Sequence, residues 1–223
     1  MGTERRGKDT LASKPRLICL EGSAGTGKTT ICDALGLRLR VTGLRVAQVS
    51  EFSATAAGDE LRNGLARFAA DRPPWSPIET LQRCTEDKFR SLSSVDYRDR
   101  AFVILDRGFI TQLVLGMPLI RCHADRVFAA ATIRQFNAWL ADTFEVSTIV
   151  LNTPLAENIF RLEQRLGRLM CSHEQATLRL ERLRYLSLTR KPGTERLNLR
   201  VVPAAGPPED ITTEIIGIRC ESA

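Results

Sequence analysis

Residues 22–29, Gly-Ser-Ala-Gly-Thr-Gly-Lys-Thr, match the pattern G-x-x-x-x-G-K-[ST] in full. A short, nearly continuous apolar run, residues 16–21, precedes them, and residues 29–40 follow with isoleucine and leucine at helical spacing. Glycines allow a tight turn between a strand and a helix, and the backbone N–H groups of that turn then face an anion. A glycine turn that only caps a helix does not explain a lysine followed by a threonine at this point. The stretch therefore predicts a phosphate-binding P-loop.

The residue types in this loop indicate which groups would hold a nucleoside triphosphate. Lys28 is expected to act as a catalytic residue by reaching the β- and γ-phosphates, and the Thr29 hydroxyl is expected to ligate Mg²⁺. We therefore predict ATP and Mg²⁺ as cofactors. The predicted ATP-binding residues of the loop are Gly22, Ser23, Ala24, Gly25, Thr26, Gly27, Lys28, Thr29 and Thr30.

The rest of the chain alternates short apolar runs with longer amphipathic segments, a pattern typical of a parallel sheet covered on both faces. We expect an α/β fold of the P-loop NTPase type: a three-layer sandwich with a five-stranded parallel sheet, helices on both faces and a helical lid at about residues 161–175. Residues 1–14 are expected to form a flexible tail before a single kinase domain, 15–223. The predicted strands are residues 16–21, 45–49, 101–106, 147–151 and 198–203. The predicted helices are residues 29–40, 59–70, 77–92, 109–115, 125–143, 154–166, 172–188 and 208–218.

Acidic residues stand at the ends of the second and third predicted strands. A P-loop site needs a carboxylate at a neighbouring strand tip to hold Mg²⁺, so we predict Asp106 as a metal ligand and catalytic residue. An aspartate that only starts a turn is the alternative. Glu51 is expected at the carboxyl edge of the sheet, where it would orient or deprotonate an acceptor hydroxyl as a catalytic residue. A solvated loop glutamate is the alternative reading of Glu51.

Arg107 follows Asp106 directly, at a place where motor and AAA-type ATPases usually carry a glutamate that polarises water. A planar guanidinium pairs well with phosphate oxygens. We therefore predict Arg107 as a catalytic residue that clamps the phosphate of an acceptor. An arginine in place of that glutamate favours phosphate transfer to a substrate over hydrolysis of ATP.

Three arginines lie in and after the helix predicted at residues 154–166. Arg161 and Arg165 are one turn apart and share a face, while Arg168 comes after a glycine. A mobile lid that carries arginines would bind the γ-phosphate and exclude water. We predict Arg161 and Arg165 as catalytic, and Arg161 and Arg168 as ATP-binding. A solvated face with local pairs to Glu157 and Glu163 is the alternative.

Composition excludes several classes of protein. The 223 residues are 43% hydrophobic and 26% charged, as in ordinary globular proteins, and no apolar run is long enough to span a membrane. The first residues form no apolar signal segment, so we expect a cytoplasmic protein. Six scattered cysteines and two histidines do not form a zinc pattern, and Cys19 and Cys32 are expected to be buried, reduced thiols. The net charge of +6 is not gathered into a run, so a nucleic-acid partner is not expected.

Over residues 16–218 the chain resembles the thymidylate kinase family of nucleoside-monophosphate kinases. The resemblance implies a P-loop kinase that moves the γ-phosphate of ATP to dTMP, with Arg107 on the acceptor phosphate and a homodimer held by helices. Residues 202–206 lie where such kinases cradle adenine, so Ala204 is a further predicted ATP contact. The segments that carry the resemblance are residues 20–30 (LEGSAGTGKTT), 50–52 (SEF), 59–62 (DELR), 103–107 (VILDR), 151–168 and 182–186 (RLRYL).

The departures from the family pattern concern the acceptor half. Many members carry an acidic residue near the sugar where this chain has Ala24, and an aromatic residue where it has Gly108. An Asp-Lys pair at residues 87–88 replaces an Asp-Arg pair, Cys84 falls near an expected base-stacking phenylalanine, and Phe52 replaces a proline. Trp75 or Phe89 would supply a stacking ring instead, although either type of ring more often packs in a core.

Two kinase hypotheses and two other classes follow. The first is transfer to dTMP or a related nucleotide, and the second is a kinase of the same build that acts on a hydroxyl of a nucleoside or another small molecule, such as a natural product. A regulatory NTPase switch is disfavoured because residues 106–109 (DRGF) are not D-x-x-G and no guanine-binding N/T-K-x-D motif is found. A basic nucleic-acid-binding module has only the net charge to support it.

Overall fold

The computed structural model describes residues 14–69, 74–97, 101–188 and 198–220, so the predicted tail lies almost wholly outside the described residues. The described chain forms one five-stranded sheet in the order β2-β3-β1-β4-β5, with each neighbouring pair parallel. The prediction of a parallel five-stranded sheet is confirmed. The strands are β1 (Arg16–Glu21), β2 (Val46–Val49), β3 (Phe102–Asp106), β4 (Glu145–Asn152) and β5 (Leu199–Pro203).

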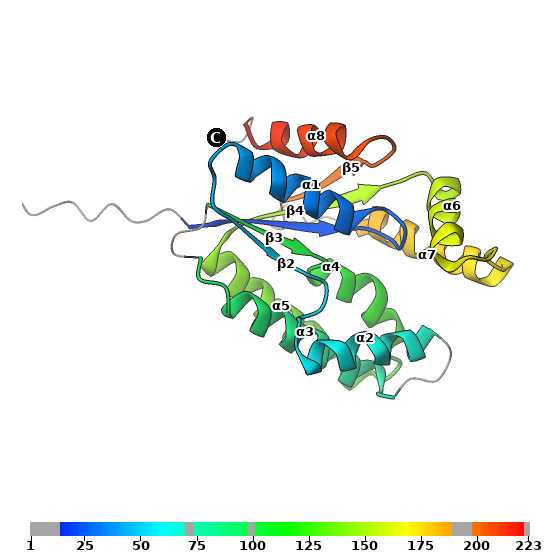
Figure 1. The fold of residues 1–223 in the computed structure, drawn as a ribbon. Coiled ribbons are helices and arrows are strands. Elements are labelled where there is room, and N and C mark those ends of the chain that lie inside the picture. The colour runs from blue at the N-terminus through cyan, green and yellow to red at the C-terminus, as the bar shows by residue number, and fades with distance from the viewer. Residues whose placement is uncertain (1–13, 70–73, 98–100, 189–197, 221–223) are drawn as a thin grey trace, which may run out of the picture.

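Helices cover both faces of this sheet and make it the middle of three layers (Figure 1). α1 and α8 pack together over one face, α3 and α5 pack together over the other, and α6 and α7 lie beyond the ends of the strands. The helices are α1 (Lys28–Val41), α2 (Ala56–Ala69), α3 (Pro77–Ser93), α4 (Phe109–Thr111), α5 (His123–Thr143), α6 (Leu155–Leu166), α7 (Ser172–Leu188) and α8 (Pro208–Cys220). None of the helices in the described ranges is long and apolar enough to cross a bilayer.

Two apolar cores result from the alternation of side chains along the strands. In β1, Leu17 and Cys19 join the core under α3 and α5, whereas Ile18 and Leu20 join the core under α1 and α8. Cys32 is buried in the second of these cores, so the predicted burial of Cys19 and Cys32 is confirmed.

The same alternation directs the two carboxylates that end the central strands. Glu21 continues the series of Leu17 and Cys19 and therefore points toward α4 and away from α1. Asp106 ends β3 on the side of Ile104, which packs under α1. As a consequence, Asp106 meets the first turn of α1, where the P-loop ends.

Local signals explain where several helices begin and end. Gly43, with a φ of 82°, follows the end of α1, as the sequence predicts. Ser76 and Glu79 form a reciprocal capping box at the start of α3, with Pro77 in its first turn.

The helix predicted at residues 109–115 is not one regular helix. α4 has a single turn and passes into the π-helical η1 (Gln112–Gly116) and the 3-10 helical η2 (Met117–Leu119). A π-helical turn carries an extra residue per turn, and Pro118 stands inside η2, so the regular ladder of hydrogen bonds is not sustained. Apolar spacing alone does not distinguish these turn types.

Candidate functional site

The P-loop residues 22–29 connect β1 to α1 as predicted, and the loop needs its glycines. Gly22 has a φ of 141° and Gly25 a φ of 77°, backbone conformations that favour glycine. A β-carbon on Gly22 would lie 2.7 Å from the Leu151 carbonyl oxygen, and one on Gly25 would lie 2.8 Å from the Asn158 carbonyl oxygen. The loop is therefore wedged between β4 and α6. The Asn158 side chain also donates to the Ser23 hydroxyl at 3.0 Å, which fixes α6 against the loop.

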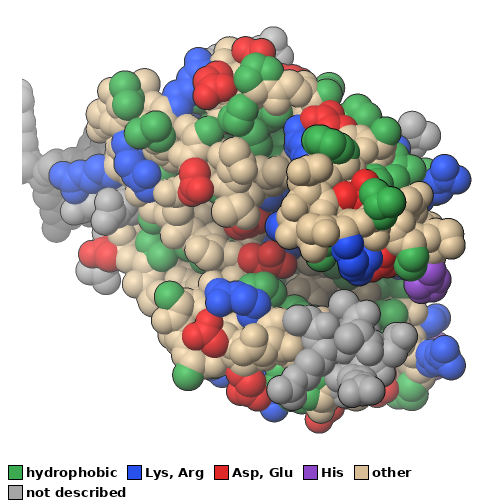
Figure 2. Space-filling view, turned by 45° about the vertical axis from the view of Figure 1, so that its right-hand side comes forward, with side chains coloured by type: hydrophobic (Ala, Val, Ile, Leu, Met, Phe, Trp, Pro, Cys, Tyr) green, Lys and Arg blue, Asp and Glu red, His purple; other side chains and the backbone are tan. Residues whose placement is uncertain are grey.

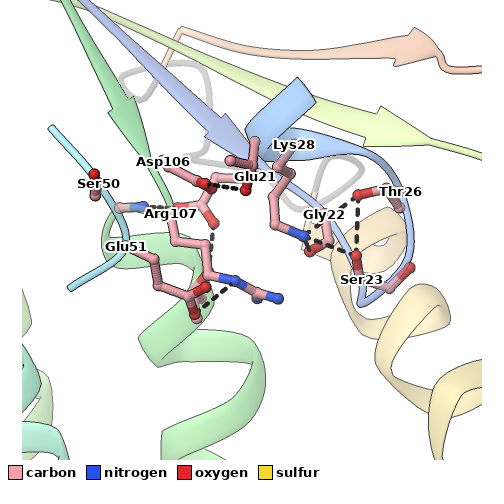
Figure 3. A network of polar contacts seen from close by, with 12 residues as sticks. Glu21, Gly22, Ser23, Thr26, Lys28, Ser50, Glu51, Asp106 and Arg107 are labelled. Atoms are coloured by element: carbon pink, nitrogen blue, oxygen red, sulfur yellow. Dashed lines mark hydrogen bonds and ion pairs between the residues drawn. The ribbon is translucent and has the colours of Figure 1, made fainter. Parts of the chain in front are cut away.

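Lys28 turns back into this loop (Figure 3). Its ammonium group donates to the carbonyl oxygens of Gly22 and Ser23 at 2.9 and 2.8 Å, and to the Thr26 hydroxyl at 3.4 Å. Burial, with help from the charge of Arg107, lowers the pKa of Lys28 to about 7, although Asp106 opposes this shift. The predicted phosphate-binding lysine thus lies centrally in the loop, with its charge held by backbone oxygens.

Thr29 and Asp106 meet as a P-loop metal site requires. The Thr29 hydroxyl donates to Asp106 Oδ2 at 2.7 Å, while Asp106 Oδ1 is buried and has no hydrogen-bond partner among the described residues. One hydroxyl and one carboxylate with a free oxygen fit the oxygen ligands that Mg²⁺ prefers, with phosphates and water completing the set. Among the described residues, no group of three or more His, Cys, Asp or Glu side chains could hold a metal ion.

Arg107 and Glu51 form an ion pair across the ends of β3 and β2, with 2.8 Å between Nε and Oε1 (Figure 3). The Arg107 side chain is 12% exposed and Glu51 is 38% exposed. Burial alone would lower the pKa of Arg107, but the nearby carboxylates, Glu51 first among them, raise it. Arg107 also has a φ of 60°, which is uncommon for a residue other than glycine and is typical of functional positions. The two predicted catalytic residues are therefore brought together.

Glu21 is a site residue that the sequence reasoning missed. It is fully buried, and its carboxylate accepts from the backbone N–H groups of Gly108 and Ile110 at 2.9 and 3.0 Å and from the Thr111 hydroxyl at 2.6 Å. Burial raises its pKa, against the lowering effect of these donors and of Arg107. Glu21 therefore anchors the segment that follows Arg107. The signal in the sequence is a carboxylate at the end of an otherwise apolar strand.

Lys88, the lysine of the Asp-Lys pair that departs from the family pattern, holds two strand ends together. It is buried, and its ammonium group donates to the carbonyl oxygens of Ser50 and Asp106, both at 2.8 Å. Burial lowers its pKa to about 8. Beside it, Asp87 accepts from the backbone N–H of Ser53 at 3.0 Å. This pair on α3 ties together the ends of β2 and β3, from which Glu51 and Asp106 project.

A cleft of about 470 Å³ opens beside the Thr29–Asp106 pair. The face toward which the strands point is hollowed, with acidic and basic side chains around the hollow (Figure 2). Phe52 is the aromatic residue that lines the cleft, and the guanidinium of Arg62 lies 5.8 Å from its ring centre. Trp75 instead stacks under Arg83, and Phe89, 45% exposed, packs against Trp139. The cleft is lined by Thr29, Cys32, Asp33, Gln48, Val49, Ser50, Glu51, Phe52, Arg62, Ile104 and Asp106.

The three lid arginines are placed differently. Arg161 pairs with Glu157, and one of its nitrogens would lie 3.3 Å from a β-carbon on Gly27, so it borders the P-loop. Arg165 is exposed on the same helix. Arg168 pairs with both oxygens of Glu174 at 2.9 and 2.6 Å, a local contact at the start of α7. Of the three, only Arg161 is brought to the P-loop in this conformation.

Ala204, the predicted adenine contact, is buried just after β5. Its N–H donates to the Asn152 carbonyl at 3.1 Å, and its carbonyl accepts from the Thr153 hydroxyl at 3.2 Å. These bonds join the ends of β4 and β5. Gly206, with a φ of 117°, then turns the chain toward α8.

Comparison with known proteins agrees with this architecture. A thymidylate kinase of Methylococcus capsulatus is 28% identical over 204 residues, which cover 90% of this chain and 92% of the relative. The crystal structure of thymidylate kinase from Ehrlichia chaffeensis superimposes with a TM-score of 0.60 at 15% identity, over 92% of this chain and 98% of that chain. No protein-family model matches the chain. The similarity therefore extends over nearly the whole chain in both sequence and fold.

Proposed function

We propose that this thymidylate kinase-like P-loop kinase transfers the γ-phosphate of Mg²⁺-bound ATP to a nucleoside monophosphate, with dTMP as the first candidate acceptor. The observation that carries the proposal is the group of Lys28, Thr29 and Asp106. A buried ammonium, a hydroxyl and a carboxylate with a free oxygen lie together at the start of α1. The three groups together are those that a P-loop kinase uses to bind the phosphates and the Mg²⁺ of a nucleoside triphosphate.

On the donor side, the chain's own residues bind and orient the triphosphate. The backbone N–H groups of the P-loop and the start of α1 would face its phosphates. Lys28 would exchange carbonyl oxygens for phosphate oxygens, and Arg161 borders the same loop from α6. Thr29 and Asp106 would hold Mg²⁺, which neutralises charge on the β- and γ-phosphates. Arg165 and Arg168 would join only after a movement of α6 and α7.

On the acceptor side, Arg107 is the residue positioned for a phosphate. An acceptor phosphate oxygen attacks the γ-phosphorus, the bond to the bridging oxygen breaks, and ADP leaves with that oxygen's electron pair. Such an oxygen is already ionised at neutral pH and needs no base. Glu51 then serves to orient Arg107 through their ion pair. The residues predicted from the sequence thus have complementary tasks in this reaction.

A hydroxyl acceptor is the second candidate, and the placement of Glu51 favours it. A carboxylate that lines the cleft next to Asp106 is placed to take a proton from an attacking hydroxyl. The two candidates differ in the acceptor that the enzyme consumes. The test is ADP release with Mg²⁺-ATP and a panel of nucleoside monophosphates, nucleosides and other alcohols. Turnover only with monophosphates supports the first candidate, and turnover only with alcohols supports the second. ADP release without any acceptor would contradict both.

Arg107→Ala is expected to weaken the acceptor and not ATP. The variant loses the guanidinium that would pair with the acceptor phosphate, so the KM for the acceptor should rise about 10- to 100-fold while the KM for ATP changes less than about threefold. Steady-state kinetics with each substrate varied in turn measure both constants. Arg90→Ala, which removes an exposed arginine of α3, serves as the control. Equal weakening of both substrates would contradict the assigned role.

Binding of ATP is expected to take up protons at about pH 8. Lys28 has a pKa of about 7 in the free protein, and the phosphates would raise it by favouring the ammonium form. The affinity for ATP should therefore be highest below about pH 7 and fall as the pH rises above it. Titration calorimetry in Tris and HEPES, whose heats of ionisation differ, counts the protons. Equal heats in the two buffers would contradict this expectation.

A further inference from the structure

Lys88 is a buried cation that the proposed reaction does not use. It lies on α3, and burial lowers its pKa to about 8. Its ammonium group donates to the carbonyl oxygens of Ser50 and Asp106. Lys88 is not among the described residues that line the cleft. Because a buried charge is costly unless polar groups hold it, these two contacts indicate the purpose of the residue.

The two carbonyl oxygens belong to the residues that directly precede Glu51 and Arg107. Lys88 therefore fixes the peptide that leads from Ser50 to Glu51 and the peptide that leads from Asp106 to Arg107. The side chains of Glu51 and Arg107 extend from these peptides and form their ion pair at the neighbouring strand ends (Figure 3). A single ammonium group thus holds the backbone on both sides of this pair.

The backbone at Arg107 needs such support. Its φ of 60° lies in the left-handed region, which is costly for a residue other than glycine and persists only where the surroundings hold it. The peptide before Arg107 is held at both of its polar atoms, since its carbonyl oxygen accepts from Lys88 and its N–H donates to the Leu20 carbonyl at 3.0 Å. The direction in which the guanidinium extends therefore depends in part on Lys88.

Asp87, the neighbour of Lys88 on α3, holds the other end of the segment that carries Glu51. It is buried and accepts from the backbone N–H of Ser53 at 3.0 Å and from the Ser53 hydroxyl. The segment is therefore held at one end by Lys88 and at the other by Asp87, while Glu51 and Phe52 between them line the cleft. α3 is itself fixed by buried leucines of the apolar core, so it provides a rigid platform for both contacts.

We propose that Lys88 is a positioning residue of the transfer reaction, which aligns the Glu51–Arg107 ion pair for the phosphate acceptor through the two peptides before it. The inference rests on the proposed function and adds to it a residue that touches neither substrate. Two separate contacts hold Asp106: Thr29 binds its carboxylate on the ATP side, and Lys88 binds its carbonyl oxygen on the acceptor side. Loss of Lys88 should therefore weaken the acceptor and leave ATP nearly unaffected.

Lys88→Met is expected to raise the KM for the acceptor about tenfold, because a small misplacement of a group that binds a reacting phosphate is costly. Methionine fills a similar buried volume but donates no hydrogen bond, so both carbonyl oxygens are released. The guanidinium of Arg107 is then no longer aligned. The KM for ATP should stay within about threefold. Steady-state kinetics with each substrate varied in turn measure the two constants.

A double-mutant cycle with Arg107→Ala tests whether Lys88 acts through the ion pair. The cycle compares the unaltered protein, the two single variants and the double variant, with the best acceptor of the panel. Once the guanidinium is absent there is nothing left to align, so Lys88→Met should then raise the acceptor KM by less than about threefold. Thr85→Val is the control, because it removes a hydrogen bond from the Thr85 hydroxyl to the Leu81 carbonyl within α3. The control should keep both KM values.

Thermal melts accompany the kinetics, and Lys88→Gln takes the place of Lys88→Met throughout the cycle if the methionine variant does not fold. The glutamine side chain is shorter than that of lysine by a methylene group, so it does not reach both carbonyl oxygens. The same rise in the acceptor KM is expected for Lys88→Gln, with the KM for ATP again nearly unchanged.

Three outcomes would contradict this role of Lys88. One is an unchanged acceptor KM in the folded variant, and another is an equal rise in the KM values for ATP and the acceptor, which would mean that Lys88 supports the site as a whole. The third is full additivity with Arg107→Ala, which would mean that Lys88 does not act through the ion pair. In all three cases the unaltered protein is an active kinase and the proposed function stands. Failure of the unaltered protein to phosphorylate any acceptor would instead overturn the proposed function and the inference with it.

Discussion

Lys28→Ala is expected to lower phosphoryl transfer by about a thousandfold while the fold remains intact. The ammonium group is held inside the P-loop by the loop's own carbonyl oxygens, where the phosphates would be bound. A preorganised charge in a water-poor site stabilises the transferred group far more than an exposed charge would. The lysine belongs to neither apolar core. Its lowered pKa also means that its charged form is less stable in the folded than in the unfolded chain, so its loss should not unfold the protein.

Single-turnover transfer to the best acceptor of the panel, together with a thermal melt, measures both expectations for Lys28→Ala. Lys14→Ala is the matched control, because Lys14 donates to a backbone carbonyl at an exposed site far from the loop. The control should keep full activity. Undiminished transfer by a well-folded Lys28→Ala would contradict the mechanism, and so would full binding of ATP with normal proton uptake.

Glu21→Ala is expected to reduce the free energy of unfolding by about 3–5 kcal/mol. The substitution leaves the N–H groups of Gly108 and Ile110 and the Thr111 hydroxyl without their acceptor in a fully buried place. It also removes a carboxylate whose charge acts on Arg107. Glu21→Gln, which keeps the shape and one carbonyl oxygen, should cost less.

Urea denaturation followed by circular dichroism measures this loss for Glu21→Ala and Glu21→Gln. Glu145→Ala is the matched control, because Glu145 is 60% exposed and pairs with Arg16 at the surface. Its effect should stay below about 1 kcal/mol. If Glu21→Ala were as stable as the control, the carboxylate would not anchor the segment after Arg107.

The fold could be predicted from the sequence because its signals are local. Apolar runs marked the strands, glycines marked the turns, and alternation with helices gave the parallel sheet. The segment at residues 109–119 was predicted less well, since its π-helical and 3-10 turns depend on what the chain packs against. The meeting of Thr29 with Asp106 could also be predicted, because the P-loop motif places Thr29 at the start of α1 and an apolar strand places Asp106 at its own carboxyl end.

The rest of the site depends on partners that are distant in the sequence. Lys88 departs from the Asp-Arg pair of the family pattern, and in the structure it joins Ser50 to Asp106. Arg168 is predicted, like Arg161, to bind ATP, but in this conformation it pairs with Glu174. No pattern of spacing reveals such contacts, because tertiary packing decides them.

Phosphorus-31 NMR of one mixture tests the central claim most directly. The mixture contains the protein, Mg²⁺, ATP and dTMP, and the spectrum reveals which molecule carries the transferred phosphate. The account predicts that the dTMP singlet is replaced by the two coupled doublets of a diphosphate while ATP is converted to ADP. An unchanged spectrum, or one in which ATP yields only inorganic phosphate, would contradict it.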